Sequence, residues 1–190
     1  KAVSLGADRS IHLSDDAIAG SDVVATGYAL AKVIERENPD LVLLGQQSDD
    51  GECYSIGAVV AQFLGRPSVT QVIKLDLAGN EITCERQAEY GYDTVKVTLP
   101  AVLSVGDAIN EPRYPSLKAI MGAKKKPLET LSAGDAGVDA SKVGTDGSNV
   151  SCGDFKAPPA KDAGLVFEDE DTDATVEKIV AWLDERKLIA

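Results

Sequence analysis

Four consecutive aliphatic residues, Leu41–Leu44, are followed directly by Gly45. A continuous apolar run of this length is typical of a strand covered on both faces in a parallel sheet. A loop comes next, and then a helical pattern over residues 54–64 that Gly65 ends. A strand, a glycine-containing loop and a helix in this order form one βα unit, so we expect an α/β fold.

Further elements are predicted on both sides of this unit. A helix is expected from Ser21 or Asp22 to about Asn38, where Pro39 ends it. Its predicted apolar face consists of Val23, Thr26, Leu30, Val33 and Ile34. Strands are predicted over residues 11–13, 69–77, 81–87, 94–99 and 101–105, with a hairpin turn at 78–80.

The last third of the chain has a different composition. Residues 132–164 are rich in Gly, Ser, Asp and Pro, which predicts an extended tail. A final helix is expected over residues 174–186, with Val176, Ile179, Val180 and Leu183 on one face. An arm that ends in an amphipathic helix suggests contact with a partner. The predicted organisation is therefore a partial α/β domain over 1–131 and an arm over 132–190.

Charge and composition exclude several functions. A net charge of −12 argues against nucleic-acid binding and against attraction to anionic membranes. No apolar run is long enough to insert into a bilayer and no signal peptide is recognisable, so we expect a cytoplasmic protein. Cys53, Cys84 and Cys152 fit neither a disulfide framework nor a zinc site. With His12 as the single histidine, no catalytic or metal-binding residue is predicted.

The loop after Leu41–Leu44 is the predicted ligand site, because α/β sheets bind ligands outside the carboxyl ends of their strands. Gly51 permits a turn, and unpaired amides where the helix starts would attract a phosphate. The loop contains no lysine and no P-loop pattern, while its three acidic residues must avoid a phosphate. The alternative is a simple capped βα turn. The candidate binding residues are Gly45, Gln47, Asp50, Gly51, Cys53, Tyr54 and Ser55.

A second candidate surface lies at residues 110–126, where Pro112 and Pro115 make the chain stiff. Ser116 is positioned to cap a short helix with an apolar stripe, and three lysines follow at its end. The segment is suited to docking, although it could equally pack on its own core. The candidate recognition residues are Leu117, Ile120, Met121 and Arg113.

The β subunit of electron transfer flavoprotein has a signature that resembles this segment, NEPRYPSLKAIMGAKKK. The resemblance continues through DLVLLGQQ at 40–47 and LPAVLSV at 99–105, and covers most of residues 1–140. It implies an adenine-nucleotide-binding, mostly parallel sheet with helices on both faces, a hairpin excursion and a C-terminal arm that embraces the α subunit. In that family SLGAD lies well inside the subunit, so we expect a fragment or a chain whose first part is absent.

The resemblance also implies ligands and partners. FAD would be held mainly by the α subunit, and this subunit would hold AMP or a second FAD. Asp50, Gly57 and the acidic residue at Glu52 match both versions of the loop. Gly51 matches the second-FAD version alone, whereas Cys53 matches the AMP version, which we prefer. In the family an acidic residue often stands at the position of Gln87 and faces the flavin domain of the α subunit.

The implied function is electron transfer rather than catalysis. Leu117, with Ile120 and Met121, would insert into a pocket on acyl-CoA dehydrogenases or related flavin dehydrogenases. Electrons would then pass to a respiratory acceptor. Two alternatives stay open: an electron-bifurcating complex with a second FAD, and a nucleotide-binding regulatory module without redox function.

Overall fold

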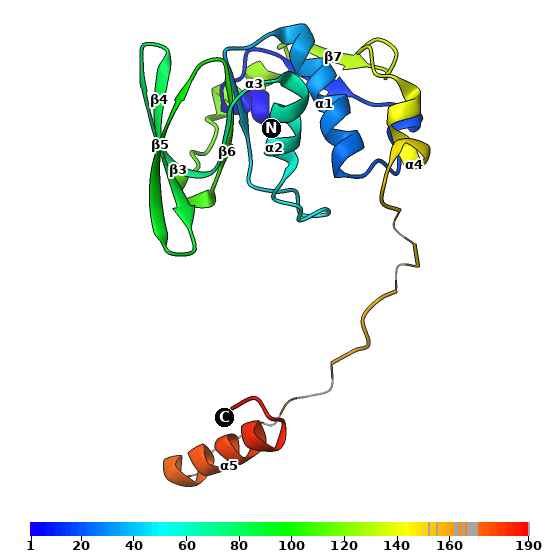
Figure 1. Cartoon of the computed structure of the whole chain (residues 1–190). Coiled ribbons are helices and arrows are strands. Elements are labelled where there is room, and N and C mark those ends of the chain that lie inside the picture. Colours follow the sequence, from blue (N-terminus) through cyan, green and yellow to red (C-terminus); the bar gives the residue numbers. More distant parts are fainter. Residues whose placement is uncertain (152, 155, 162–163, 165, 167–170, 190) are drawn as a thin grey trace. The chain divides into compact units, whose positions relative to one another are not determined.

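The computed structural model describes residues 1–151, 153–154, 156–161, 164, 166 and 171–189 (Figure 1). The chain divides into two compact units, Lys1–Gly153 and Asp154–Ala190. Cys152 and the acidic residues 168–170 before the predicted last helix lie outside the described residues.

The first unit contains two sheets. In the smaller, β1 (Ser10–Leu13) pairs in parallel with β7 (Leu128–Leu131). The five-stranded sheet has the order β2-β6-β3-β4-β5. Its strands are β2 (Leu41–Leu44), β3 (Ser68–Ala78), β4 (Glu81–Ala88), β5 (Gly91–Thr98) and β6 (Ala101–Val105). β2, β6 and β3 run parallel, and β3, β4 and β5 form antiparallel hairpins, so the predicted α/β class with a hairpin excursion is confirmed.

Two helices pack beside the parallel strands. α1 (Val23–Glu37) packs on α2 (Ile56–Leu64), and α2 packs on β6 and β3 (Figure 1). α2 covers the side of β2 on which Val42 is buried. Leu43 points to the other side and is 56% exposed, so the expectation that this run is covered on both faces was wrong for this chain.

The ends of α1 follow the predicted pattern, but its buried face does not. Asp22 caps the start, and Asn38 ends the helix in the left-handed conformation. The fully buried residues are mostly small ones, Ala25, Gly27, Ala29 and Ala31, together with Tyr28. The larger aliphatic residues, such as Val33 and Ile34, are partly buried at the edges of two different core clusters. α1 lies between these clusters, so neighbours on both sides crowd its central face.

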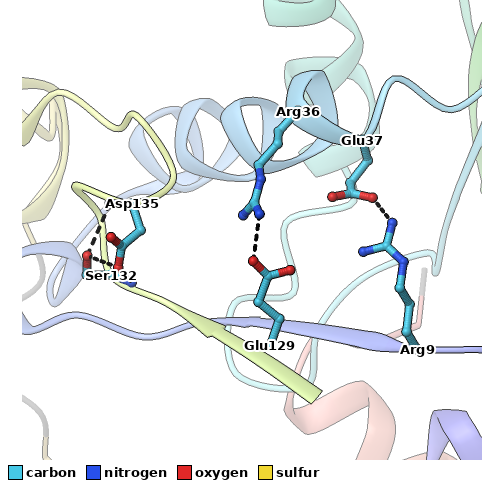
Figure 2. Close-up of polar contacts among 6 residues, drawn as sticks. All are labelled: Arg9, Arg36, Glu37, Glu129, Ser132 and Asp135. Carbon is cyan, nitrogen blue, oxygen red and sulfur yellow. Dashed lines mark hydrogen bonds and ion pairs between the residues drawn. The ribbon is translucent and has the colours of Figure 1, made fainter. Parts of the chain in front are cut away.

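Ion pairs connect the last turns of α1 to the small sheet. Arg36 lies 2.6 Å from Glu129 on β7, and Glu37 pairs with Arg9, next to β1 (Figure 2). These side chains are partly exposed, so each pair contributes at most about 1 kcal/mol. They nevertheless fix the direction of α1 over β1 and β7.

The predicted extended tail after residue 131 is corrected by the structure. Segment 132–150 packs on the first unit and buries Ala133, Ala136, Val138 and Val143 in a cluster with Tyr28. The segment includes the short helices η4 (Ala140–Lys142) and α4 (Gly144–Gly147). The boundary between the units therefore follows Gly153 rather than residue 131. Composition was misleading here because the few apolar side chains are spaced so that they all reach one cluster.

Four short helices complete the first unit around these elements: η1 (Ala2–Leu5), η2 (Asp16–Ile18), η3 (Asp107–Ile109) and α3 (Leu117–Ala123). In the second unit, α5 (Thr172–Glu185) starts two residues before its predicted position. The Asp171 side chain caps α5. Among the described residues, no helix combines the length and apolar composition that crossing a bilayer requires.

Candidate functional site

The loop of the predicted nucleotide site joins β2 to α2. Leu44 at the end of β2 lies opposite Ser104 at the end of the parallel strand β6, so the two carboxyl ends meet beside the loop. All seven candidate binding residues, from Gly45 to Ser55, lie on this loop and are exposed. The structure thus brings them to the edge of the sheet at which α/β proteins bind ligands.

Ser48 organises the interior of the loop. Its hydroxyl oxygen accepts a hydrogen bond from the Gly51 amide at 3.4 Å, and its carbonyl oxygen accepts one from the Glu52 amide at 3.0 Å. The hydroxyl group of Ser48 and the amides of Asp50 and Gly51 lower the pKa of the Asp50 carboxyl group. Asp50 is therefore ionised and bonded within its own loop, as an acidic residue near a phosphate must be.

Two residues besides the predicted glycine, Glu52 and Tyr54, shape the turns of the loop. Glu52 and Tyr54 adopt left-handed conformations with φ of 43° and 48°. Such a conformation costs a non-glycine residue about 1 kcal/mol or more. Gly51 does not have a positive φ, but a Cβ atom there would lie 3.2 Å from the Ser48 hydroxyl oxygen. Gly51 lies in the turn at residues 49–51, and its missing side chain leaves room there for the Ser48 hydroxyl group.

Helix α2 starts two residues after its predicted position, at Ile56. The Ser55 hydroxyl group donates a hydrogen bond to the Cys53 carbonyl oxygen at 2.8 Å instead of capping the helix. In the part of the chain that the structure describes, no side chain caps the first amides of α2. The helix end that could receive an anion is therefore formed by the amides of Ile56 and Gly57 rather than by those of Cys53 and Tyr54.

Gly57 and Ser104, neither of which is among the candidate binding residues, lie against each other behind the loop. Gly57 is buried, and a Cβ atom there would lie 3.2 Å from Cβ of Ser104. Ser104 is 3% exposed. A polar residue near the end of an otherwise apolar strand was the signal that could have identified Ser104.

The side chain of Cys53 is exposed, and its thiol donates to the Gly51 carbonyl oxygen at 3.0 Å.

The second candidate surface is formed by α3 and the proline-containing segment before it. The Ser116 hydroxyl oxygen accepts a hydrogen bond from the Ala119 amide at 3.2 Å, which confirms the predicted cap. Leu117 is 74% exposed, Met121 65% and Ile120 45%. Tyr114, which the sequence did not single out, is 96% exposed beside them. The apolar stripe therefore faces solvent instead of packing on its own core.

Arg113 and Lys126 connect this surface to the start of the chain. The Arg113 guanidinium group donates to the Leu5 carbonyl oxygen, and the Lys126 ammonium group donates to the Ala7 carbonyl oxygen at 2.5 Å. α3 itself packs against η1. Arg113 thus has a clear structural contact, and any role in partner recognition stays a prediction.

The tip of the β4–β5 hairpin presents two exposed aromatic rings. Tyr90 is 81% exposed and Tyr92 68%. The Tyr90 hydroxyl group lies 3.0 Å from a carboxylate oxygen of Asp93, and Nε of Arg86 lies 3.0 Å from the other. The bond to Asp93 raises the pKa of Tyr90. Gln87 is also exposed, but it takes no part in this network.

Among the described residues, no group of three or more His, Cys, Asp or Glu side chains could hold a metal ion. The geometry instead offers a helix start without a side-chain cap and an exposed apolar helix. Neither site gathers the side chains that nucleophilic or acid–base catalysis requires.

The chain is similar to known proteins along its whole length. Residues 1–136 match the family described as "Electron transfer flavoprotein domain". Three similar proteins are all called "Electron transfer flavoprotein subunit beta". The one from Mycobacterium bovis is 41% identical, over 100% of this chain and 71% of the relative. Those from Syntrophomonas wolfei and Bos taurus are 39% and 38% identical, over 96% and 97% of this chain and 67% and 68% of the relatives.

Proposed function

The chain belongs to the electron transfer flavoprotein β subunit family, and from this premise we propose that it works in a heterodimeric electron carrier. In this proposal the carrier accepts electrons from flavin dehydrogenases, such as acyl-CoA dehydrogenases, and passes them to a respiratory acceptor. This subunit positions the partners and performs no catalysis of its own. The flavin, held mainly by the α subunit, supplies the redox chemistry.

The proposal rests mainly on the exposed apolar stripe of α3, which consists of Leu117, Ile120 and Met121. Leu117 projects from a short helix that Ser116 caps and that the Arg113 contact connects to η1. An apolar side chain that enters a partner pocket typically contributes about 2 kcal/mol or more to binding. One small anchor on a rigid base suits a redox contact, which must form specifically and dissociate quickly.

The loop after β2 supports a nucleotide in this subunit. The uncapped amides of Ile56 and Gly57 would bind a phosphate group, and the inward contacts of Asp50 keep its charge within the loop. Ser104 and Gly57 leave room for the helix end to lie close to the sheet. AMP, the preferred ligand, would have a structural role and supply no electrons. The match of Gly51 to the second-FAD version is the observation that favours bifurcation as the second candidate.

The second unit supports pairing with an α subunit. Val176, Ile179 and Val180 lie at helical spacing on α5 and are 52%, 43% and 48% exposed. Trp182 and Ile189 add further apolar surface. An amphipathic helix with this much exposed apolar surface is typical of a segment that binds a partner.

The test is to co-express the chain with a flavin-binding α subunit, count the bound nucleotides and measure electron transfer from a dehydrogenase. One flavin and one AMP per dimer are expected; two flavins would favour bifurcation. Leu117→Ala is expected to raise the KM for the dehydrogenase at least tenfold, with flavin content unchanged. Leu77→Ala is the matched control, because Leu77 is 57% exposed on β3, far along the chain from α3. Failure to form a complex, or an unchanged KM in Leu117→Ala, would contradict the proposal.

A further inference from the structure

Besides its apolar contacts, segment 132–150 is held to the rest of the first unit by its backbone amides. Five of them donate to side-chain oxygen atoms that come from residues 15–28. The donor–acceptor pairs are Ala133 to Asp15, Asp139 to Tyr28, Gly144 to Ser21, and Asn149 and Val150 to Asp22. A short stretch around the start of α1 thus forms a row of acceptors, and segment 132–150 lies along it.

Asp22 is the last acceptor of this row and also the N-cap of α1. Its Oδ1 atom accepts hydrogen bonds from the amides of Val24 and Ala25 at 3.0 and 2.9 Å. Its Oδ2 atom accepts from the amides of Asn149 and Val150 at 2.7 and 3.3 Å. One carboxylate group therefore caps the helix with one oxygen atom and holds the end of the segment with the other.

Ser148 completes the contact from the opposite side. Many helices begin with a capping box, in which a Glu or Gln at the third helical position accepts a bond from the N-cap amide. α1 has Ala25 at that position, which has no side-chain acceptor. The hydroxyl oxygen of Ser148 accepts the bond from the Asp22 amide at 2.8 Å, and the hydroxyl group donates to the Gly144 carbonyl oxygen at 2.6 Å. The missing acceptor is thus supplied from 126 residues away along the chain.

Glycines allow the two segments to approach this closely. A Cβ atom at Gly144, which has φ of 69°, would lie 2.6 Å from the Ala17 carbonyl oxygen. A Cβ atom at Gly20 would lie 2.6 Å from the Thr145 hydroxyl oxygen. The contact between residues 17–22 and 144–150 is therefore specific in position, and the following residues leave the unit from a defined place.

We propose that Asp22 and Ser148 form a reciprocal clamp that fixes the end of segment 132–150, after which the chain continues into the second unit, and that Asp22 is the positioning residue of this junction. Val150 is the last residue that the clamp holds, and the first unit ends three residues later at Gly153. The use of the clamp in assembly rests on the proposed function, because a fixed starting point raises the effective concentration of α5 at its partner.

The clamp can be separated from the cap by substitution. Asp22→Ser keeps an N-cap residue of similar quality but provides a single side-chain oxygen atom, so α1 stays capped while Asn149 and Val150 lose their acceptor. Ser148→Ala removes the other half of the clamp and leaves Asp22 in place. Asp15→Ser is the matched control, because Asp15 likewise joins a helix cap to one amide of the segment, at Ala133.

Amide hydrogen exchange of the full chain, followed by NMR, tests the clamp without any partner. In Asp22→Ser, exchange at Asn149 and Val150 is expected to accelerate by about tenfold or more, as when a hydrogen bond to a charged group is lost. The amides of Val24 and Ala25 stay protected. Ser148→Ala accelerates the same two amides, and Asp15→Ser does not. Unchanged exchange at Asn149 and Val150 in Asp22→Ser would overturn the clamp.

Titration of the chain with a flavin-binding α subunit tests whether the clamp contributes to assembly. The Kd for the α subunit is expected to rise about two- to fivefold in Asp22→Ser, because the arm then starts from a less defined position. Faster exchange with an unchanged Kd would overturn the positioning role. That outcome is distinct from failure of the proposed function, in which the unaltered chain itself would not bind the α subunit.

Discussion

Gly57 at the start of α2 lies directly against Ser104 at the end of β6, and a Cβ atom at residue 57 would be 3.2 Å from Cβ of Ser104. The neighbours of Ser104 on β6, Val102 and Leu103, are fully buried, so the strand has little freedom to move away. This contact sets how closely the uncapped end of α2 approaches the sheet.

Gly57→Val is therefore expected to destabilise the protein by about 1–3 kcal/mol through overpacking. Urea unfolding measures the change. Gly122→Val is the control, because Gly122 is also helical but a Cβ atom there would meet nothing within 4 Å. Equal effects of the two substitutions would show that valine in a helix, rather than the contact with Ser104, accounts for the loss.

The carboxylates that hold segment 132–150 predict a sensitivity to acid. Hydrogen bonds from Ala17 and Ala133 lower the pKa of Asp15 below 3.8, and those from Ala25 and from Asn149 act in the same direction on the pKa of Asp22. A lowered folded-state pKa means that the stabilisation is complete above the unfolded-state pKa. It is lost as the pH falls through the folded-state value.

The urea midpoint should consequently fall as the pH is lowered below about 4, where unfolded Asp begins to bind protons. The Asp15→Asn and Asp22→Asn double variant should show a smaller fall, because its side chains do not titrate. If the urea midpoint falls with pH equally steeply in the unaltered chain and in the double variant, other carboxylates control the acid transition.

The cysteines predict a difference in thiol reactivity. Cys53 is exposed on the loop, whereas Cys84 is fully buried on β4, and burial raises the pKa of the Cys84 thiol. In a Cys152→Ser background, a thiol reagent is expected to label one site quickly and the second only on unfolding. If the proposed nucleotide site is correct, AMP slows the fast phase. A fast phase that AMP does not change would argue against a nucleotide next to Cys53.

The hairpin tip predicts a coupled titration. Because its bond to Asp93 raises the pKa of Tyr90, Asp93→Asn is expected to bring that pKa back towards its usual value. The change is measured by ultraviolet titration of tyrosinate, with Tyr90→Phe as the subtraction control. A Tyr90 pKa that is the same with and without the Asp93 carboxylate would exclude the bond in solution.

Local patterns predicted much of the fold. The apolar run at Leu41–Leu44, the caps at Asp22 and Ser116, and the turn at residues 78–80 all depend on neighbours within a few positions, and the structure contains each of them. The exposure of Leu117 also agrees with the docking interpretation of its segment. The loop at residues 45–55 follows a strand as predicted, and its role as a nucleotide site stays a prediction.

The sequence by itself determined the class of fold, the family and the places of the two candidate sites, because these depend on residue spacing along the chain. Tertiary structure alone decided that residues 132–150 pack on the first unit, that Ser104 faces Gly57, and that Ser148 completes the cap of α1. Each of these contacts joins residues far apart in the chain. Their partners are chosen by the packing of the core, which no local pattern contains.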